Sequence, residues 1–243
     1  MSDEPPVRLY CFAHSGNGVS VFDGWAAHTG PGVEPVPVRL PAATAWPTGP
    51  APATRQALLN ATLPQVTPTG AAPYAMYGHG LGAVIALTVA QALTEARLPG
   101  PCLLAVGACA PPTPPGGHIS DHDLLHQLGG HIPPASDEGV FLRAMLPVLR
   151  ADLELARSLH EAARRPLSTG PLTTPLLVVA SQSNPLAPPA AADGWHAWTK
   201  GPRWQRTVPG HHFFVRGGRQ LPRLLGRACR VARRLAQEPA PAG

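Results

Sequence analysis

The sequence lacks long hydrophobic runs and has few cysteines. No stretch of about 18 or more apolar residues occurs, so we expect no membrane-spanning helix. The first residues, MSDEPPVRLY, lack the basic and apolar segments of a secretory signal, and we expect none. No C-x-x-C pair occurs among the cysteines, which are Cys11, Cys102, Cys109 and Cys229. Free thiols in a reducing, cytoplasmic compartment are therefore expected.

Acidic residues are also scarce, 14 against 19 basic ones, which gives a net charge of +5. This excess favours acidic partners. No nucleic-acid-binding motif accompanies it, so no nucleic acid is expected as a partner. No membrane is expected as a partner either. Hydrophobic residues make up 44% of the 243 residues, enough for one globular domain spanning residues 1–243, and a monomer is the default.

Strand-like and helical segments alternate along the chain. Strands are expected at Val7–Phe12, Val33–Leu40, Tyr74–Tyr77, Cys102–Cys109, Leu176–Ala180 and Arg206–Val208. Helices are expected at Val19–His28, Ala53–Leu63, from Ala83 onward, and at Leu221–Leu235. This alternation predicts the α/β class, with a mostly parallel central sheet covered by helices on both faces. Pro35 and Pro37 predict an edge position for the second strand.

Two further regions carry specific expectations. Residues 112–166 contain a helical pattern from about Ser120 to Arg165 after the fourth strand, where such folds often carry a lid. The last helix is rich in arginine, which predicts either a solvated face or a docking surface for an acidic protein.

The stretch Tyr74–Leu93 organises the chain. Its apolar strand leads into Gly78-His79-Gly80-Leu81-Gly82 and then into an apolar helix. Strand, glycine-rich turn and helix form the context of the nucleophile elbow, G-x-S-x-G. Gly80 occupies the position of the attacking serine, and glycine has no side chain.

Several motifs, in order along nearly the whole chain, resemble those of one family. CFAHSGNG at Cys11–Gly18 resembles the CFPHAGG opening of type II thioesterases, the editing enzymes of polyketide and nonribosomal peptide assembly lines. YGHGLGAVIAL resembles their GHSMGALVAF elbow, and LPVLRADLEL at Leu146–Leu155 resembles their lid segment. Their W-x-x-x-T and PGGHFF motifs are similar to Trp195-x-x-x-Thr199 and to the PGHHFF that begins at Pro209. The resemblance implies the α/β-hydrolase fold.

The resemblance also implies roles for individual residues. His212 corresponds to the catalytic histidine, Gly80 to the serine and Asn184 to the aspartate. The backbone N–H groups of Ser15 and Leu81 correspond to the oxyanion hole. We further assign His14 and His79, which flank these positions, to substrate binding. The implied partner is an acyl or peptidyl carrier protein, whose phosphopantetheine arm delivers the substrate, or a small-molecule intermediate.

Gly80 and Asn184 depart from the serine–histidine–aspartate pattern. Without a serine no acyl-enzyme forms, and an amide cannot stabilise an imidazolium as a carboxylate does. Three functions stay open. The first is a repurposed catalyst with His212 as general base or acid in cyclisation, isomerisation, elimination or water-mediated hydrolysis. The others are a non-catalytic acyl- or carrier-binding partner, and an ordinary acyl thioesterase inactivated at Gly80.

Other candidates have simpler interpretations. Asp193 could replace the missing carboxylate, but its position before Trp195 predicts an exposed helical residue. The four histidines between residues 118 and 131 suggest a metal, yet only His122 and His126 share a helical face and no zinc motif accompanies them. We expect them to face solvent or to line the lid, and we expect no metal and no cofactor. They are His118, His122, His126 and His131.

Overall fold

The computed structural model describes residues 4–13, 18–41, 51–66, 72–112, 135–163, 170–216 and 218–237, apart from the side chains of residues 51–53, 137, 138, 142 and 163. The strands are β1 (Val7–Phe12), β2 (Val33–Pro37), β3 (Tyr74–His79), β4 (Leu103–Gly107), β5 (Leu176–Ser181) and β6 (Arg203–Val208). The α-helices are α1 (Ala26–Thr29), α2 (Ala51–Val66), α3 (Leu81–Glu95), α5 (Asp137–Ala163) and α6 (Gln220–Gln237). The 3₁₀ helices are η1 (Gly18–Phe22), η3 (Pro189–Trp198) and η4 (Phe214–Arg216).

The six strands form one parallel sheet in the order β2-β1-β3-β4-β5-β6. The predicted α/β class and parallel sheet are confirmed. β2 lies at an edge, as Pro35 and Pro37 predict, because a proline cannot donate to a strand on its other side. β6, at the opposite edge, begins at Arg203 and not at the predicted Arg206. Most of its side chains are exposed, so its apolar pattern is too weak to mark the start.

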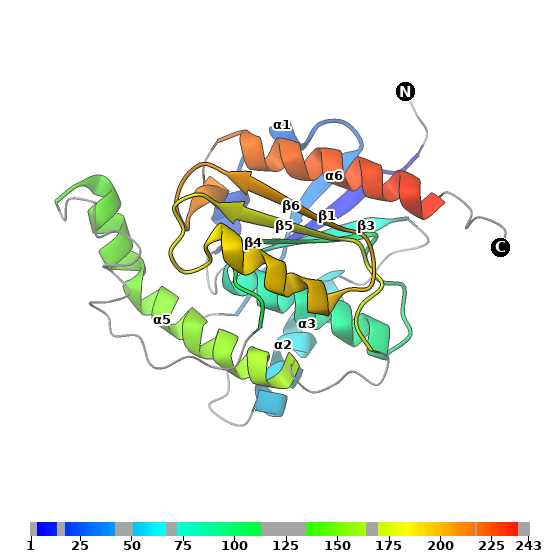
Figure 1. Ribbon diagram of the computed structural model, residues 1–243, viewed down its shortest axis with the longest axis horizontal. Helices are drawn as coiled ribbons and strands as arrows, with labels where there is room; N and C mark the ends of the chain where they lie inside the picture. Colours follow the sequence, from blue (N-terminus) through cyan, green and yellow to red (C-terminus); the bar gives the residue numbers. More distant parts are fainter. Residues whose placement is uncertain are drawn as a thin grey trace.

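Helices cover both faces of the sheet (Figure 1). α2, α3 and α5 pack together on one face, and α1 and α6 pack together on the other. Successive side chains of a strand point to opposite faces. Tyr10 and Phe12 therefore enter the core beneath α3, whereas Leu9 and Cys11 enter the core beneath α6. The central strands β3, β4 and β5 are buried on both sides, which is why they are apolar on both sides.

Two glycines bring α3 close to the sheet. A Cβ atom on Gly82 would lie 2.2 Å from the carbonyl oxygen of Phe12, and one on Gly78 would lie 2.1 Å from that of Gly82. Neither distance is possible for a real Cβ atom. The outer glycines of the elbow motif therefore let the start of α3 rest directly on the end of β1.

Two helical predictions also differ from the structure. The predicted continuous helix Val19–His28 is wrong, because it is divided into η1 and α1 around Gly24, whose φ of +77° interrupts a helix. The described part of the predicted insert is α5, one helix of 27 residues that contains Pro147. Ser120, Gly129, Gly130 and the four histidines of the possible metal cluster lie outside the described residues.

The four cysteines are all free. No helix within the described ranges is both long and apolar enough to cross a membrane. The same part of the chain contains no group of three or more His, Cys, Asp or Glu side chains placed to hold a metal ion.

Candidate active site

The centre of the candidate site is the sharp turn at Gly80, between β3 and α3. Gly80 has φ +56° and ψ −122°, a conformation that residues with a side chain rarely adopt. Its N–H donates to the carbonyl oxygen of Gly107 at 2.8 Å. The backbone therefore keeps the strained strand–turn–helix geometry of a nucleophile elbow, although the side chain is missing.

His212 faces this turn from the loop after β6. A Cβ atom on Gly80 would lie 3.5 Å from Nε2 of His212 and 3.7 Å from its Cε1. These are ordinary contact distances, so a side chain at position 80 would fit beside the imidazole. With glycine in place, a small gap lies directly against Nε2.

The His212 imidazole is neutral and has an unused nitrogen. The residue is only 9% exposed, and burial lowers the pKa of His212 from 6.5 to about 4. Its Nδ1 atom has no hydrogen-bond partner among the described residues. Phe213 packs edge-on against the ring, with centroids 5.1 Å apart.

His79 holds the backbone of His212. Its Nε2–H donates to the carbonyl oxygen of His212 at 2.8 Å, and its Nδ1 accepts from the Tyr77 hydroxyl at 2.9 Å. Both ring nitrogens are thereby occupied, although His79 also lines the cavity described below. The hydrogen bonds make His79 a positioning residue, and its predicted part in substrate binding stays a prediction.

Asn184 lies on the loop after β5, next to the loop that carries His212. The Ser183 N–H donates to the carbonyl oxygen of Gly210 at 3.1 Å, which joins the two loops. Asn184 is 2% exposed, and its Oδ1 accepts from the Leu186 N–H at 3.2 Å. Its Nδ2 has no partner among the described residues, like Nδ1 of His212. Asp193, the alternative carboxylate, is exposed on η3.

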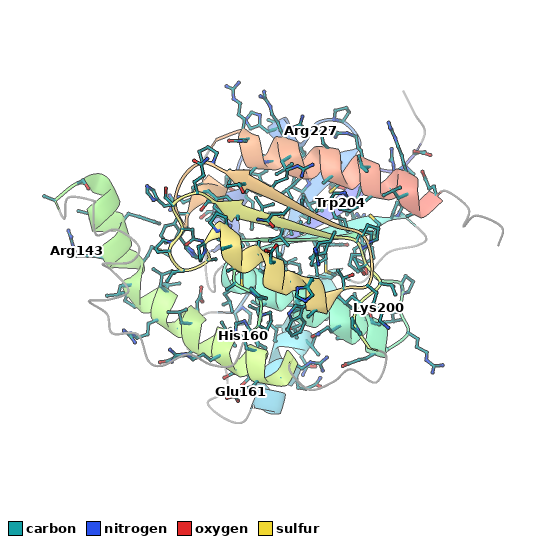
Figure 2. All side chains as sticks on the ribbon, viewed as in Figure 1. Arg143, His160, Glu161, Lys200, Trp204 and Arg227 are labelled. Atoms are coloured by element: carbon teal, nitrogen blue, oxygen red, sulfur yellow. The ribbon has the colours of Figure 1, made fainter. Side chains whose placement is uncertain are left out.

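A cavity of about 190 Å³ opens over Gly80 and His212. Its lining is mainly apolar and comes from α3, the end of β4, the His212 loop and one face of α5. Asp152 and His160, both on α5, add polar groups that the sequence reasoning did not single out. His160 is labelled on this helix in Figure 2. Asp152 falls within the quoted lid segment, which could have indicated it.

Cys109 also lines the cavity, at the end of β4. Burial raises the pKa of its thiol to about 12. The thiol is therefore protonated at neutral pH and is a poor replacement for the missing nucleophile.

The W-x-x-x-T residues support the wall of this cavity. Trp195 is completely buried, and its Nε1–H donates to the carbonyl oxygen of Cys109 at 3.1 Å. The Thr199 hydroxyl donates to the carbonyl oxygen of Thr174 at 2.7 Å and accepts from the Gly201 N–H at 2.9 Å. Both side chains join η3 to neighbouring segments, so they position the site without touching Gly80.

Of the two predicted oxyanion-hole residues, the structure describes Leu81 but not Ser15. Leu81 is the first residue of α3 and lines the cavity. Its N–H belongs to the first turn of the helix, where backbone donors have no intrahelical acceptor. His14 and Ser15 lie outside the described residues, so their assignments stay predictions.

We expect acid to destabilise the fold through the buried His212 and the half-buried His160. Burial lowers the pKa of both His212 and His160 from 6.5 to about 4. Between these values the unfolded chain binds more protons than the folded one, so stability falls as the pH falls from about 6.5 towards 4. The loss at pH 5 should be about 2 kcal/mol for each histidine. Urea denaturation of the native protein and of His160→Gln at pH 7 and pH 5 measures it. Equal pH dependence in both proteins would contradict the assignment to His160.

Comparison with known proteins identifies the family. The family model described as "Thioesterase domain" matches residues 7–230. RedJ, a thioesterase from the prodiginine biosynthetic pathway in Streptomyces coelicolor, superposes with a TM-score of 0.71 and 30% identity, over 95% of this chain and 89% of RedJ. The predicted α/β-hydrolase fold, with its parallel sheet flanked by helices, is confirmed by such structural neighbours.

Curated relatives agree with this result. A probable cadicidin biosynthesis thioesterase from Streptomyces griseus is 26% identical over 215 residues, which cover 86% of this chain and 58% of the relative. The thioesterase PikA5 from Streptomyces venezuelae is 28% identical over 218 residues, 86% of this chain and 75% of PikA5. The chain thus spans little more than half the length of the first relative. On the match over residues 7–230, the chain belongs to the thioesterase family.

Proposed function

We propose that this chain acts on acyl thioester intermediates of a polyketide or nonribosomal peptide pathway without forming an acyl-enzyme. His212 is the group that exchanges a proton or a hydrogen bond with the substrate. The observation that carries this proposal is the gap at Gly80, which opens directly against Nε2 of His212 inside an apolar cavity. Membership of the thioesterase family supports a thioester as the substrate.

The gap supplies room for a reacting group. In a serine hydrolase the nucleophile would occupy this space, and the N–H of the next residue would bind the developing oxyanion. Here a carbonyl oxygen or another small substrate group can lie beside Nε2 of His212. The Leu81 N–H, at the start of α3, is the donor available for a negative charge that develops on this oxygen.

Asn184 influences which ring nitrogen of His212 carries the proton. The Asn184 amide accepts through Oδ1 from Leu186, which leaves its Nδ2–H₂ group as a donor. This Nδ2 and Nδ1 of His212 are not hydrogen-bonded to each other in this structure. A pairing of this amide donor with Nδ1 when substrate binds would keep the imidazole proton on Nε2. His212 would then present an N–H to the gap, as neutral imidazoles do where they polarise a carbonyl group.

This tautomer favours some of the open reactions over others. A neutral Nε2–H cannot deprotonate a water, so His212-activated hydrolysis is the least supported. Cyclisation, isomerisation and elimination begin with a polarised carbonyl and need a separate proton acceptor. Asp152 lines the same cavity and is the carboxylate there, among the described lining residues, that can serve as an acceptor.

Replacement of His212 by alanine tests the proposal. We expect turnover of pathway thioesters to fall at least about 100-fold, because a positioned acid or base contributes about 10² to 10⁴. Mass spectrometry of a panel of acyl-carrier and released thioesters measures the product, and the protein should carry no acyl adduct. His196→Ala, at an exposed histidine on η3, is the matched control and should keep full turnover. Equal turnover by the native protein and His212→Ala would overturn the proposal.

A non-catalytic acyl-binding protein is the second candidate. The observation that favours it is the buried neutral imidazole, whose Nδ1 has no partner among the described residues, in a cavity with no nucleophile at position 80. This function predicts measurable affinity for acyl-carrier thioesters by calorimetry and no product from either protein. Conversion of the substrate that depends on His212 would exclude it.

A further inference from the structure

A row of stacked groups leads from His212 to Arg216. The ring of His212 packs against Phe213 at 5.1 Å, and Phe213 packs against Phe141 of α5 at 5.5 Å. The Arg216 guanidinium lies over the Phe141 ring, with Cζ 4.4 Å from the centroid. Together these spacings limit the distance between the His212 ring and Cζ of Arg216 to at most about 15 Å.

Arg216 lies on the lining of the cavity, yet the residue is exposed. It therefore stands where the cavity meets solvent. Within the described ranges no carboxylate forms an ion pair with it. Stacking on Phe141 holds the guanidinium plane while its N–H groups stay at the edge, free to donate.

We propose that Arg216 and Phe141 form an anion subsite that binds the phosphate of a pantetheine arm. The inference rests on the proposed function, in which the substrate is an acyl thioester. Arginine suits this ligand because its fork of N–H groups matches the oxygens of a phosphate. The stack on Phe141 orders the side chain before binding, which lowers the entropy lost when the phosphate binds.

The length of the pantetheine arm fits the spacing of the two sites. An extended chain advances about 3.5 Å for every three backbone bonds. About thirteen bonds separate phosphorus from sulfur in phosphopantetheine, so the extended arm spans about 15 Å. A phosphate on Arg216 therefore allows the thioester to reach the gap beside His212, with the acyl chain in the apolar cavity.

Calorimetry with two arm analogues tests the subsite. The probes are S-hexyl pantetheine and its phosphate ester, which have the same chain and differ only in the phosphate. We expect the native protein to bind the phosphate ester about tenfold more tightly, as expected for charge-assisted hydrogen bonds. In Arg216→Gln this advantage should disappear, so that the two probes bind with equal affinity. Equal affinities in the native protein, or an advantage that persists in Arg216→Gln, would overturn the inference.

Matched variants distinguish binding of the phosphate at a specific subsite from general attraction by the positive charge of the protein. Arg219→Gln removes an exposed arginine three residues away that does not line the cavity, and it should keep the full phosphate advantage. Phe141→Leu keeps the charge but removes the stack, so it should retain only part of the advantage. An equal loss in Arg216→Gln and Arg219→Gln would indicate this general attraction alone and would overturn the subsite. Thermal denaturation should show that all three variants are folded.

S-hexyl coenzyme A distinguishes the two sources of such a phosphate. If the arm of a carrier protein is the natural ligand, the coenzyme A analogue should bind no more tightly than the phosphate ester. Tighter binding that still depends on Arg216 would keep the subsite and identify coenzyme A thioesters as its ligands. Failure of every probe to bind would overturn both this inference and the proposed function. Equal binding of the first two probes would overturn the inference alone.

Discussion

The double variant Gly80→Ser/Asn184→Asp is expected to hydrolyse acyl thioesters up to about a million-fold faster than the native chain, since loss of the serine of a triad costs a factor of that order. Space for the new side chain exists, because a Cβ atom on Gly80 lies 3.5 Å from Nε2 of His212. Its hydroxyl can therefore reach the imidazole. Aspartate at 184 would orient the ring and stabilise its protonated form.

The single variants show how much each substitution contributes to this increase in rate. Gly80→Ser alone should reach only about 10⁻⁴ of the double variant's rate, the cost of an asparagine in the aspartate's place. Asn184→Asp alone should stay inactive because it has no nucleophile. Thiol release from acyl N-acetylcysteamine thioesters measures the rates, and mass spectrometry detects an acyl-serine. Full activity in Gly80→Ser would instead favour an ordinary thioesterase inactivated at Gly80. A double variant no faster than Gly80→Ser would show that residue 184 does not act on His212.

Serine at position 80 should also cost stability. The backbone there has φ +56°, and a residue with a side chain in a sparsely populated region costs about 1–3 kcal/mol. Denaturation of Gly80→Ser in urea measures this cost and distinguishes a poorly folded variant from an inactive one.

Trp195→Ala should lower the free energy of unfolding by about 3–5 kcal/mol, the usual cost of removing a large aromatic side chain from a core. Trp195 is fully buried, contacts Trp198 edge-on at a centroid distance of 6.4 Å, and holds the carbonyl oxygen of Cys109. Urea denaturation monitored by circular dichroism measures the loss. Trp195→Phe keeps most of the apolar volume and removes the indole N–H, so it should lose about 1–3 kcal/mol. Similar losses in both variants would contradict packing as the main contribution.

The sequence was most informative where the structural cause is local. Glycines at 78, 80 and 82 predict the elbow because each backbone position there excludes or disfavours a side chain, by close approach or by positive φ. The strand at Val7–Phe12 was predicted to the residue because it is apolar on both faces. By contrast, Gly24 divides the predicted first helix. The start of β6 was predicted wrongly because most of the side chains of this strand are exposed.

The site was predictable only in part. The order of motifs indicates that positions 80, 184 and 212 belong together, and the geometry brings Gly80 to contact distance of His212. The roles of Asn184 and Leu81 stay predictions, as do those of His14 and Ser15. No local pattern could show that both nitrogens of His79 are occupied, or that His160 of α5 lines the same cavity.

The sequence by itself therefore determined the class of fold, the family resemblance and the absence of a nucleophile at position 80. These follow from residue types, short-range periodicity and glycine positions, which act within a few residues of the chain. The tertiary structure alone decided which polar atoms are buried without a partner, as on His212 and Asn184, and which distant groups stack, as Arg216 does on Phe141. Burial and stacking depend on the packing of segments far apart in the chain, because a side chain's environment is set by neighbours in space and not by neighbours in sequence.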